Sequence, residues 1–73
     1  MAVDFVHVFK YHAPTDEQIA KYGALRAYAR AFAEKIEELV PAGADRAAAI
    51  RKVREAMMTA NSGIALNGRI DKI

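Results

Sequence analysis

The sequence predicts an all-α fold: an antiparallel helical hairpin with a short apolar N-terminal arm, which assembles into a compact homo-oligomer. Two long segments carry apolar residues at alternating spacings of three and four, the pattern of a helix face packed on another helix. A short turn-forming stretch separates them, and a short connection makes consecutive helices antiparallel neighbours. The chain has 73 residues, 53% of them hydrophobic, and no cysteine, so a second chain is the expected source of further buried surface.

Neither a metal site nor a membrane span is expected. The two histidines, His7 and His12, are not at a helical ligand spacing and have no acidic cluster beside them, so we expect no metal and no cofactor. No apolar run reaches transmembrane length, and no signal-peptide pattern is present. We therefore expect a cytoplasmic protein.

The predicted arm covers residues 1–14 and the hairpin residues 15–68, within one domain that spans residues 1–73. Residues 3–9, VDFVHVF, are apolar and rich in β-branched and aromatic residues, so they predict a short strand or an apolar arm laid over a neighbour. Because the chain offers no second strand, docking on helices is favoured.

The first long helix is expected from Asp16 to Val40. Thr15 and Gln18 have the spacing of a capping box, and Pro14 favours an extended approach to it. Six residues form its predicted packing stripe: Tyr22, Leu25, Ala29, Phe32, Ile36 and Leu39.

The second long helix is expected after Pro41 and Gly43, with Asp45 as its N-cap and Asn67-Gly68 as its end. Its predicted stripe is Ile50, Val53, Met57, Ala60 and Ile64. Asn61-Ser62-Gly63 are poor helix formers that interrupt the pattern, as a bend, a close helix crossing or a polar contact. Abundant alanines on further sides of both helices suggest several contacts between subunits.

Charge favours a small anionic ligand. The net charge of +2 is too small to argue for duplex DNA by itself. Arg26 and Arg30 are four residues apart and share one helix face. Such a surface suits a phosphate-bearing ligand; the alternative is a solvated face with ion pairs. No catalytic constellation is present, since Ser62 has no motif around it and the glycines are scattered, so we expect a binding protein and not an enzyme.

Tyr11 is the aromatic residue best placed for binding, because it precedes the helix start between Lys10 and His12. An aromatic face stacks on a base, and the planar fork of Arg26 suits a phosphate. Alternatively, Tyr11 plugs the end of the hairpin and Arg26 is a surface charge.

Three segments in this order resemble a phage family: FKYHAPT (residues 9–15), KYGALRAYARAFAEKIEEL (residues 21–39) and IRKVREAMMTANSGIA (residues 50–65). The family comprises small anti-CBASS sponge proteins that share a helical-hairpin domain with an anti-Thoeris sponge. The similarity covers roughly residues 9–67. No single motif is diagnostic, and the ordered set carries the resemblance.

The resemblance implies a function in the cytoplasm of the infected bacterial host. Sponges of this family bind cyclic oligonucleotide messengers such as 3′,3′-cyclic GMP-AMP without cleaving them, so that CBASS effectors stay inactive. Family members are hexamers that hold cyclic dinucleotides between subunits and, in some members, cyclic trinucleotides elsewhere. No membrane and no long nucleic acid are expected as partners.

The resemblance also implies site residues. Tyr11 matches the tyrosine that stacks on a base, and Arg26 matches a basic position that contacts the phosphate; His12 and Tyr22 are added by proximity. For a second site the resemblance is incomplete, because some relatives carry an arginine on the later half of the second helix, where this chain has Asn61 and Ser62 and no cation. Its candidates are Arg30, Asn61 and Arg69. The alternative function is RNA or DNA binding through the basic second helix (Arg46, Arg51, Lys52 and Arg54), and a purely structural module is a third.

Overall fold

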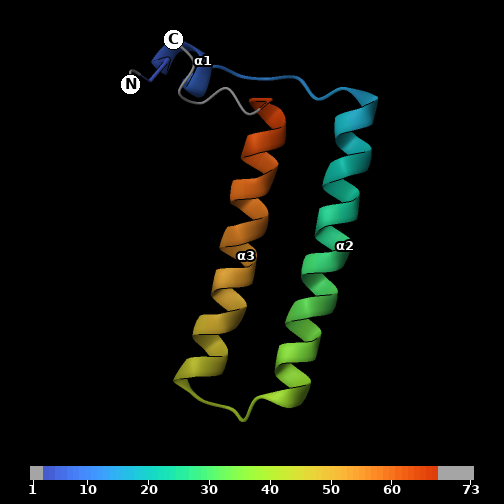
Figure 1. Ribbon diagram of the computed structural model, residues 1–73, viewed down its shortest axis with the longest axis vertical. Helices are drawn as coiled ribbons and strands as arrows, with labels where there is room; N and C mark the ends of the chain where they lie inside the picture. The colour runs from blue at the N-terminus through green and yellow to red at the C-terminus, as the bar shows by residue number, and fades with distance from the viewer. Residues whose placement is uncertain (1–2, 68–73) are drawn as a thin grey trace.

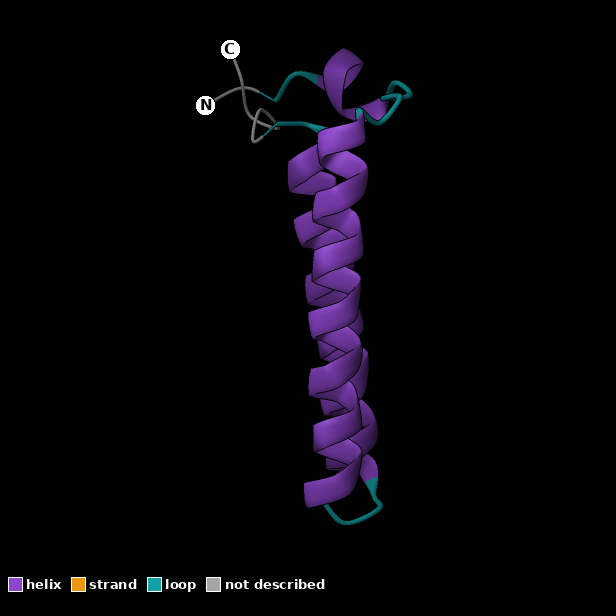
Figure 2. Cartoon of the chain, turned by 90° about the vertical axis from the view of Figure 1, so that its right-hand side faces the viewer, coloured by secondary structure: helices purple, strands orange, loops and turns teal. Residues whose placement is uncertain are grey.

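Two long helices lie side by side and antiparallel, and a short helix lies at their open end. The computed structural model describes residues 3–67. The helices are α1 (Phe5–Phe9), α2 (Asp16–Leu39) and α3 (Ala44–Ala65). Figure 1 shows α2 and α3 as the legs of the hairpin and α1 beyond the end where α2 begins and α3 ends. The view in Figure 2 shows the hairpin edge-on, as a layer one helix thick. The predicted all-α hairpin is confirmed.

α1 corrects one option of the sequence analysis, because residues 5–9 are helical and not a strand. The side chain of Asp4 caps this helix by accepting a hydrogen bond of 3.0 Å from the backbone N–H of His7. A single turn with a side-chain cap needs no pairing strand, and residues 3–67 contain none. The rings of Phe5 and Phe9 stack with their centroids 6.3 Å apart, and both remain largely exposed.

The predicted capping box starts α2. Thr15 Oγ1 accepts from the N–H of Gln18 at 3.1 Å, and Gln18 Oε1 accepts from the N–H of Thr15 at 3.0 Å. Asp16 and Glu17 place negative charge in the first turn, where the helix dipole favours it. The helix ends one residue earlier than expected, with Val40 as its C-cap.

Thr15→Ala is expected to lower the free energy of unfolding by about 1 kcal/mol, because the N–H of Gln18 loses its acceptor. Urea denaturation at a fixed protein concentration measures the change, and Thr15→Ser, which keeps the acceptor, serves as the control. An unchanged midpoint for Thr15→Ala would show that the cap contributes nothing to stability.

Polar side chains donate hydrogen bonds to carbonyls at the C-terminal ends of α2 and α3, and these contacts join the two helices. At the open end, Gln18 Nε2 donates to the carbonyl of Ile64 at 3.0 Å, and His7 Nε2 donates to that of Leu66 at 3.2 Å. At the turn, Arg46 Nη1 lies 3.5 Å from the carbonyls of Glu37 and Val40. The last carbonyls of a helix lack the usual intrahelical donor, and these side chains supply one. The carbonyl of Ile64 also accepts from the N–H of Asn67 at 3.1 Å.

α3 departs from two expectations. Its N-cap is Gly43 and not Asp45, which lies in the first turn, where its charge favours the helix dipole without a capping hydrogen bond. The helix also runs without interruption through residues 61–63. The intact backbone ladder around these residues outweighs their poor propensity, and the N–H of Leu66 still bonds the carbonyl of Ser62 at 2.9 Å. The helix ends as predicted near Asn67, whose φ of 54° is left-handed.

The interface between α2 and α3 is a narrow seam, and not every residue of the predicted stripes belongs to it. Phe32 and Leu39 remain 60% and 69% exposed, and Ala60 is also exposed. These stripes follow a 3.5-residue repeat, whereas a helix turns every 3.6 residues, so their members drift to one side of the seam. Ala29, Val53 and Met57 are half-buried members of the seam.

Two different flanks border the seam. Arg26 and Tyr28 are two residues apart, so at about 100° per residue they lie on opposite sides of α2. We call the side with Arg26, Arg30 and Arg54 the arginine flank, and the side with Tyr28 and Phe32 the aromatic flank. The aromatic flank is an apolar groove of about 330 Å³. Its lining is Leu25, Tyr28, Ala29, Phe32, Val53, Ala56, Met57 and Ala60.

The single chain leaves more surface exposed than a compact protein of its size. Leu66, at 5% exposure, is the only buried residue among residues 3–67. The accessible surface is 5815 Å². A folded monomer of 8.0 kDa is expected to expose about 4,450 Å², so the chain carries about 1,400 Å² in excess. None of the described helices is both long and apolar enough to cross a membrane.

Candidate ligand-binding site

Tyr11 lies on the linker between α1 and α2 and is 84% exposed, so both faces of its ring are accessible. The linker is fixed at both ends. On one side, His12 Nε2 donates to the carbonyl of His7 at 2.6 Å. On the other side, the Thr15 capping box begins α2. The ring of Tyr11 is thus held on a short tethered segment.

His12 is half-buried, and its ring packs edge-on against His7 with the centroids 4.7 Å apart. A carbonyl can only accept a hydrogen bond, so Nε2 of His12 carries the proton that it donates to His7. This contact, together with the bond from His7 to Leu66, connects the linker to the end of α3. The geometry makes His12 a support for Tyr11, and its role as a ligand contact stays a prediction.

Arg26 lies on the arginine flank, in a groove of about 240 Å³ between α2 and α3. The groove has an apolar floor, and three arginines contribute to its lining. Its lining is Arg26, Ala29, Arg30, Ala33, Ile50, Val53, Arg54 and Met57. Arg26 extends back toward the preceding turn, because a Cβ placed on Gly23 would lie 3.9 Å from its Nη2. An apolar floor with a cationic rim fits a ligand that has both a flat ring and a phosphate.

The charges of this groove are only partly compensated. Nε of Arg30 lies 3.6 Å from a carboxylate oxygen of Glu34, and both side chains are mostly exposed. Neither Arg26 nor Arg54 forms an ion pair within residues 3–67. The groove therefore carries an excess of positive charge.

The other predicted residues lie in different places. Tyr22 is a half-buried member of the seam, one turn before Arg26. Asn61 follows Arg54 by seven residues on α3, about 10 Å along the helix, so the second-site candidates Arg30 and Asn61 do not share a groove. Arg69 lies outside the described residues.

Asn61 has a buried Oδ1 that receives no hydrogen bond from any described residue. A buried polar atom without a partner costs about 1–3 kcal/mol. Asn61→Leu is therefore expected to raise the free energy of unfolding by about 1 kcal/mol, because an apolar group of similar size removes this cost. Thermal or urea denaturation measures it, and Asn61→Asp should destabilise because it adds a half-buried charge. A loss of stability in Asn61→Leu would show that the amide has a partner in solution.

Tyr11 and Arg26 of one chain are far apart. Arg26 comes eleven positions after Thr15, which is about 16 Å along the axis of α2, and Tyr11 precedes Thr15. The separation exceeds the length of a hydrogen bond several times, so the two residues of one chain do not face the same atoms of a small ligand.

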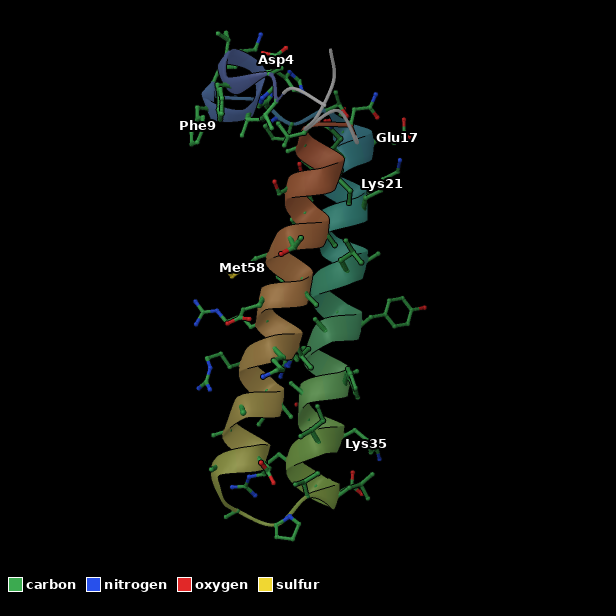
Figure 3. The ribbon with its side chains drawn as sticks, turned by 60° about the vertical axis from the view of Figure 1, so that its left-hand side comes forward. Asp4, Phe9, Glu17, Lys21, Lys35 and Met58 are labelled. Atoms are coloured by element: carbon green, nitrogen blue, oxygen red, sulfur yellow. The ribbon has the colours of Figure 1, made fainter. Side chains whose placement is uncertain are left out.

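A second hollow, of about 590 Å³, lies at the open end of the hairpin. Its lining is Thr15, Glu17, Gln18, Lys21, Ala60, Gly63, Ile64 and Asn67. The only cation in this lining, Lys21, is 3.3 Å from Glu17. Both are labelled in Figure 3, at the start of α2. Because the lysine already has an anionic partner, this hollow suits a phosphate less well than the arginine flank does.

Sequence reasoning missed Arg54 and His7 as members of the site. The sequence alone places Arg54 in a basic helix, and an antiparallel pairing of the two apolar stripes already brings it beside Arg30. His7 forms a hydrogen bond with the carbonyl of Leu66, 59 residues away, and no local sequence pattern predicts that contact.

Comparison with known proteins identifies one family. A family model described as "Acb2/Tad1, hairpin domain" matches residues 1–65. No curated protein gives a significant match. No solved structure gives one either.

Proposed function

The chain belongs to the Acb2/Tad1 hairpin-domain family, a family of cyclic-nucleotide sponges, and on that premise we propose that it sequesters cyclic dinucleotides such as 3′,3′-cyclic GMP-AMP. It binds the messenger intact and keeps it from CBASS effectors in the cytoplasm of an infected bacterium. The resemblance inferred from residues 9–67 agrees with the family match.

The observation that carries this proposal is the exposed ring of Tyr11 on a segment tied at both ends. A stacking residue contributes most when its ring is already fixed, because ordering a side chain on binding costs about 0.5–1.5 kcal/mol. The bonds of His12 and the capping box order the backbone on either side of Tyr11 during folding, so that binding has only the ring itself left to order. An aromatic ring held in solvent has no packing role within the described part of the chain.

The ligand lies between subunits in this proposal. Since Tyr11 and Arg26 of one chain are separated along α2, a compact ligand takes its stacking ring and its phosphate contact from different copies. A cyclic dinucleotide has near two-fold symmetry, and an isologous interface repeats each contact. Two stacks and two charge-assisted hydrogen bonds contribute roughly 4–12 kcal/mol before ordering costs. A homo-oligomer, which we propose to be a hexamer as in the family, supplies such interfaces.

Binding of RNA or DNA through α3 is less well supported by the geometry. Arg51 and Arg54 are three residues apart and share one face of α3, whereas Lys52 lies about 100° from Arg51, so only two of these three cations share a face. The guanidinium group of Arg46 contacts carbonyls at the end of α2, so it is not fully available to a nucleic acid. Long nucleic acids need several cations along one face.

The direct test is isothermal titration of the purified protein with 3′,3′-cyclic GMP-AMP, followed by denaturation and chromatography of the released nucleotide. We expect tight binding, fewer than one ligand per chain because sites are shared, and recovery of unchanged nucleotide. Absence of binding across a panel of cyclic di- and trinucleotides would overturn the proposal. Hydrolysed nucleotide would indicate an enzyme.

A further inference from the structure

The arginine flank brings cations of both helices to one groove. Arg30 of α2 and Arg54 of α3 line it together with Arg26, which lies one turn from Arg30. The half-buried seam residues Ala29, Val53 and Met57 form part of its floor. The groove exists only when the hairpin is closed, because each helix supplies a part of the cationic rim.

Three arginines line a groove of about 240 Å³. Like charges gathered on one face repel one another, an effect that solvent weakens and that a bound anion reverses. Glu34 offsets one charge through Nε of Arg30 at 3.6 Å, and the terminal nitrogens of that guanidinium remain as donors. Such an exposed pair is weak. The hairpin gains nothing from this crowding by itself, so the arrangement favours a ligand that carries negative charge.

The chemistry of the groove selects the kind of anion. Arginine donates two parallel N–H groups to a phosphate, a geometry that a simple point charge lacks. The apolar floor beside the rim accepts a flat, uncharged group. A bare inorganic anion uses the rim alone, whereas a nucleotide uses both the rim and the floor.

We propose that Arg54 is a ligand-contacting residue, and that Arg26, Arg30 and Arg54 together hold one phosphate of the cyclic dinucleotide across the two helices. The inference rests on the proposed function and adds a contact from α3 to it. The phosphate is thus bound by both legs of one hairpin, while the base stacks on Tyr11 of another copy. Binding therefore also holds α2 and α3 together.

The test compares Arg54→Gln with Arg51→Gln. Arg51 is one turn from Arg54 on α3 and does not line the groove, so the control removes the same charge from the same helix. Titration with 3′,3′-cyclic GMP-AMP is expected to show affinity about tenfold lower or worse for Arg54→Gln and within about twofold of wild type for Arg51→Gln. The melting temperature of Arg54→Gln without ligand should be unchanged or higher, because repulsion is relieved.

The outcomes separate this inference from the proposed function. If the wild-type protein binds and Arg54→Gln binds equally well, Arg54 is no ligand contact, and the sponge function stands. Equal losses in both variants would show a general charge effect and would also overturn the inference. If the wild-type protein binds no cyclic nucleotide, the proposed function fails, and inorganic pyrophosphate becomes the probe. A rise in melting temperature with pyrophosphate that Arg54→Gln abolishes would still support a phosphate-binding groove, and no rise would overturn it.

Discussion

Replacing Tyr11 by alanine is expected to abolish binding of a cyclic dinucleotide and to leave the helices and the assembly intact. The ring is 84% exposed in the single chain, and its removal breaks none of the hydrogen bonds that fix the linker. One stack on a base contributes about 1–3 kcal/mol. If one tyrosine from each of two chains stacks on the ligand, the variant loses roughly 2–6 kcal/mol, or about 30-fold to more than 10⁴-fold in affinity.

The control for this experiment is Tyr11→Phe, which keeps the aromatic face and removes only the hydroxyl. It should bind within a fewfold of the wild-type protein. Sedimentation of each variant reports the assembly, and titration reports the ligand. If Tyr11→Ala falls apart into smaller species, the ring is a plug between subunits, the alternative that the sequence left open. If it binds normally, Tyr11 is not the stacking platform.

The start of α2 could be predicted from sequence because its causes are local. Thr15 and Gln18 exchange two hydrogen bonds within four residues, so the capping box can be predicted without any tertiary information. The same holds for Asn67, which adopts a left-handed conformation at the end of α3. Local polar contacts of this kind do not depend on how the helices pack, and the structure reproduces them.

The features that were predicted wrongly, or not at all, from the sequence depend on packing between distant segments. A seven-residue stripe placed Phe32 in the seam, although the straight geometry of a helix carries it to the flank. Asn61-Ser62-Gly63 predicted an interruption from propensity, but α3 stays intact through them. The bond between His7 and Leu66 joins opposite ends of the chain. The groove formed by Arg26, Arg30 and Arg54 likewise required the register of α2 against α3.

The aromatic flank is the surface at which a second copy is expected to pack. On α2 it presents large side chains, with Tyr28 77% and Phe32 60% exposed, whereas α3 offers the small Ala56 and Ala60 beside them. Such a surface fits a two-fold copy of itself, because the large side chains of one copy can pack on the small side chains of the other. The excess surface of about 1,400 Å² per chain is of the size that stable interfaces bury.

Phe32→Asp is accordingly expected to dissociate the assembly and, with it, to abolish ligand binding. A carboxylate in the centre of an apolar groove is an unpaired charge, which costs several kcal/mol on burial, and two-fold symmetry applies the cost twice. Sedimentation equilibrium over a range of concentrations measures the shift toward the monomer. Binding fails as well, because Tyr11 and Arg26 of one chain cannot complete the site. Phe32→Leu, which keeps the groove apolar, should retain both properties.

The two readouts together test how the site is built. A dissociated Phe32→Asp variant that still binds cyclic dinucleotide at wild-type affinity would show that one hairpin contains the whole site, contrary to the separation of Tyr11 and Arg26 along α2. An intact assembly would instead show that the aromatic flank is not the interface and that subunits meet on another side. Loss of both is the expected result, because in the proposed assembly the apolar surface of the single chain brings the stacking ring of one copy to the phosphate-binding groove of the next.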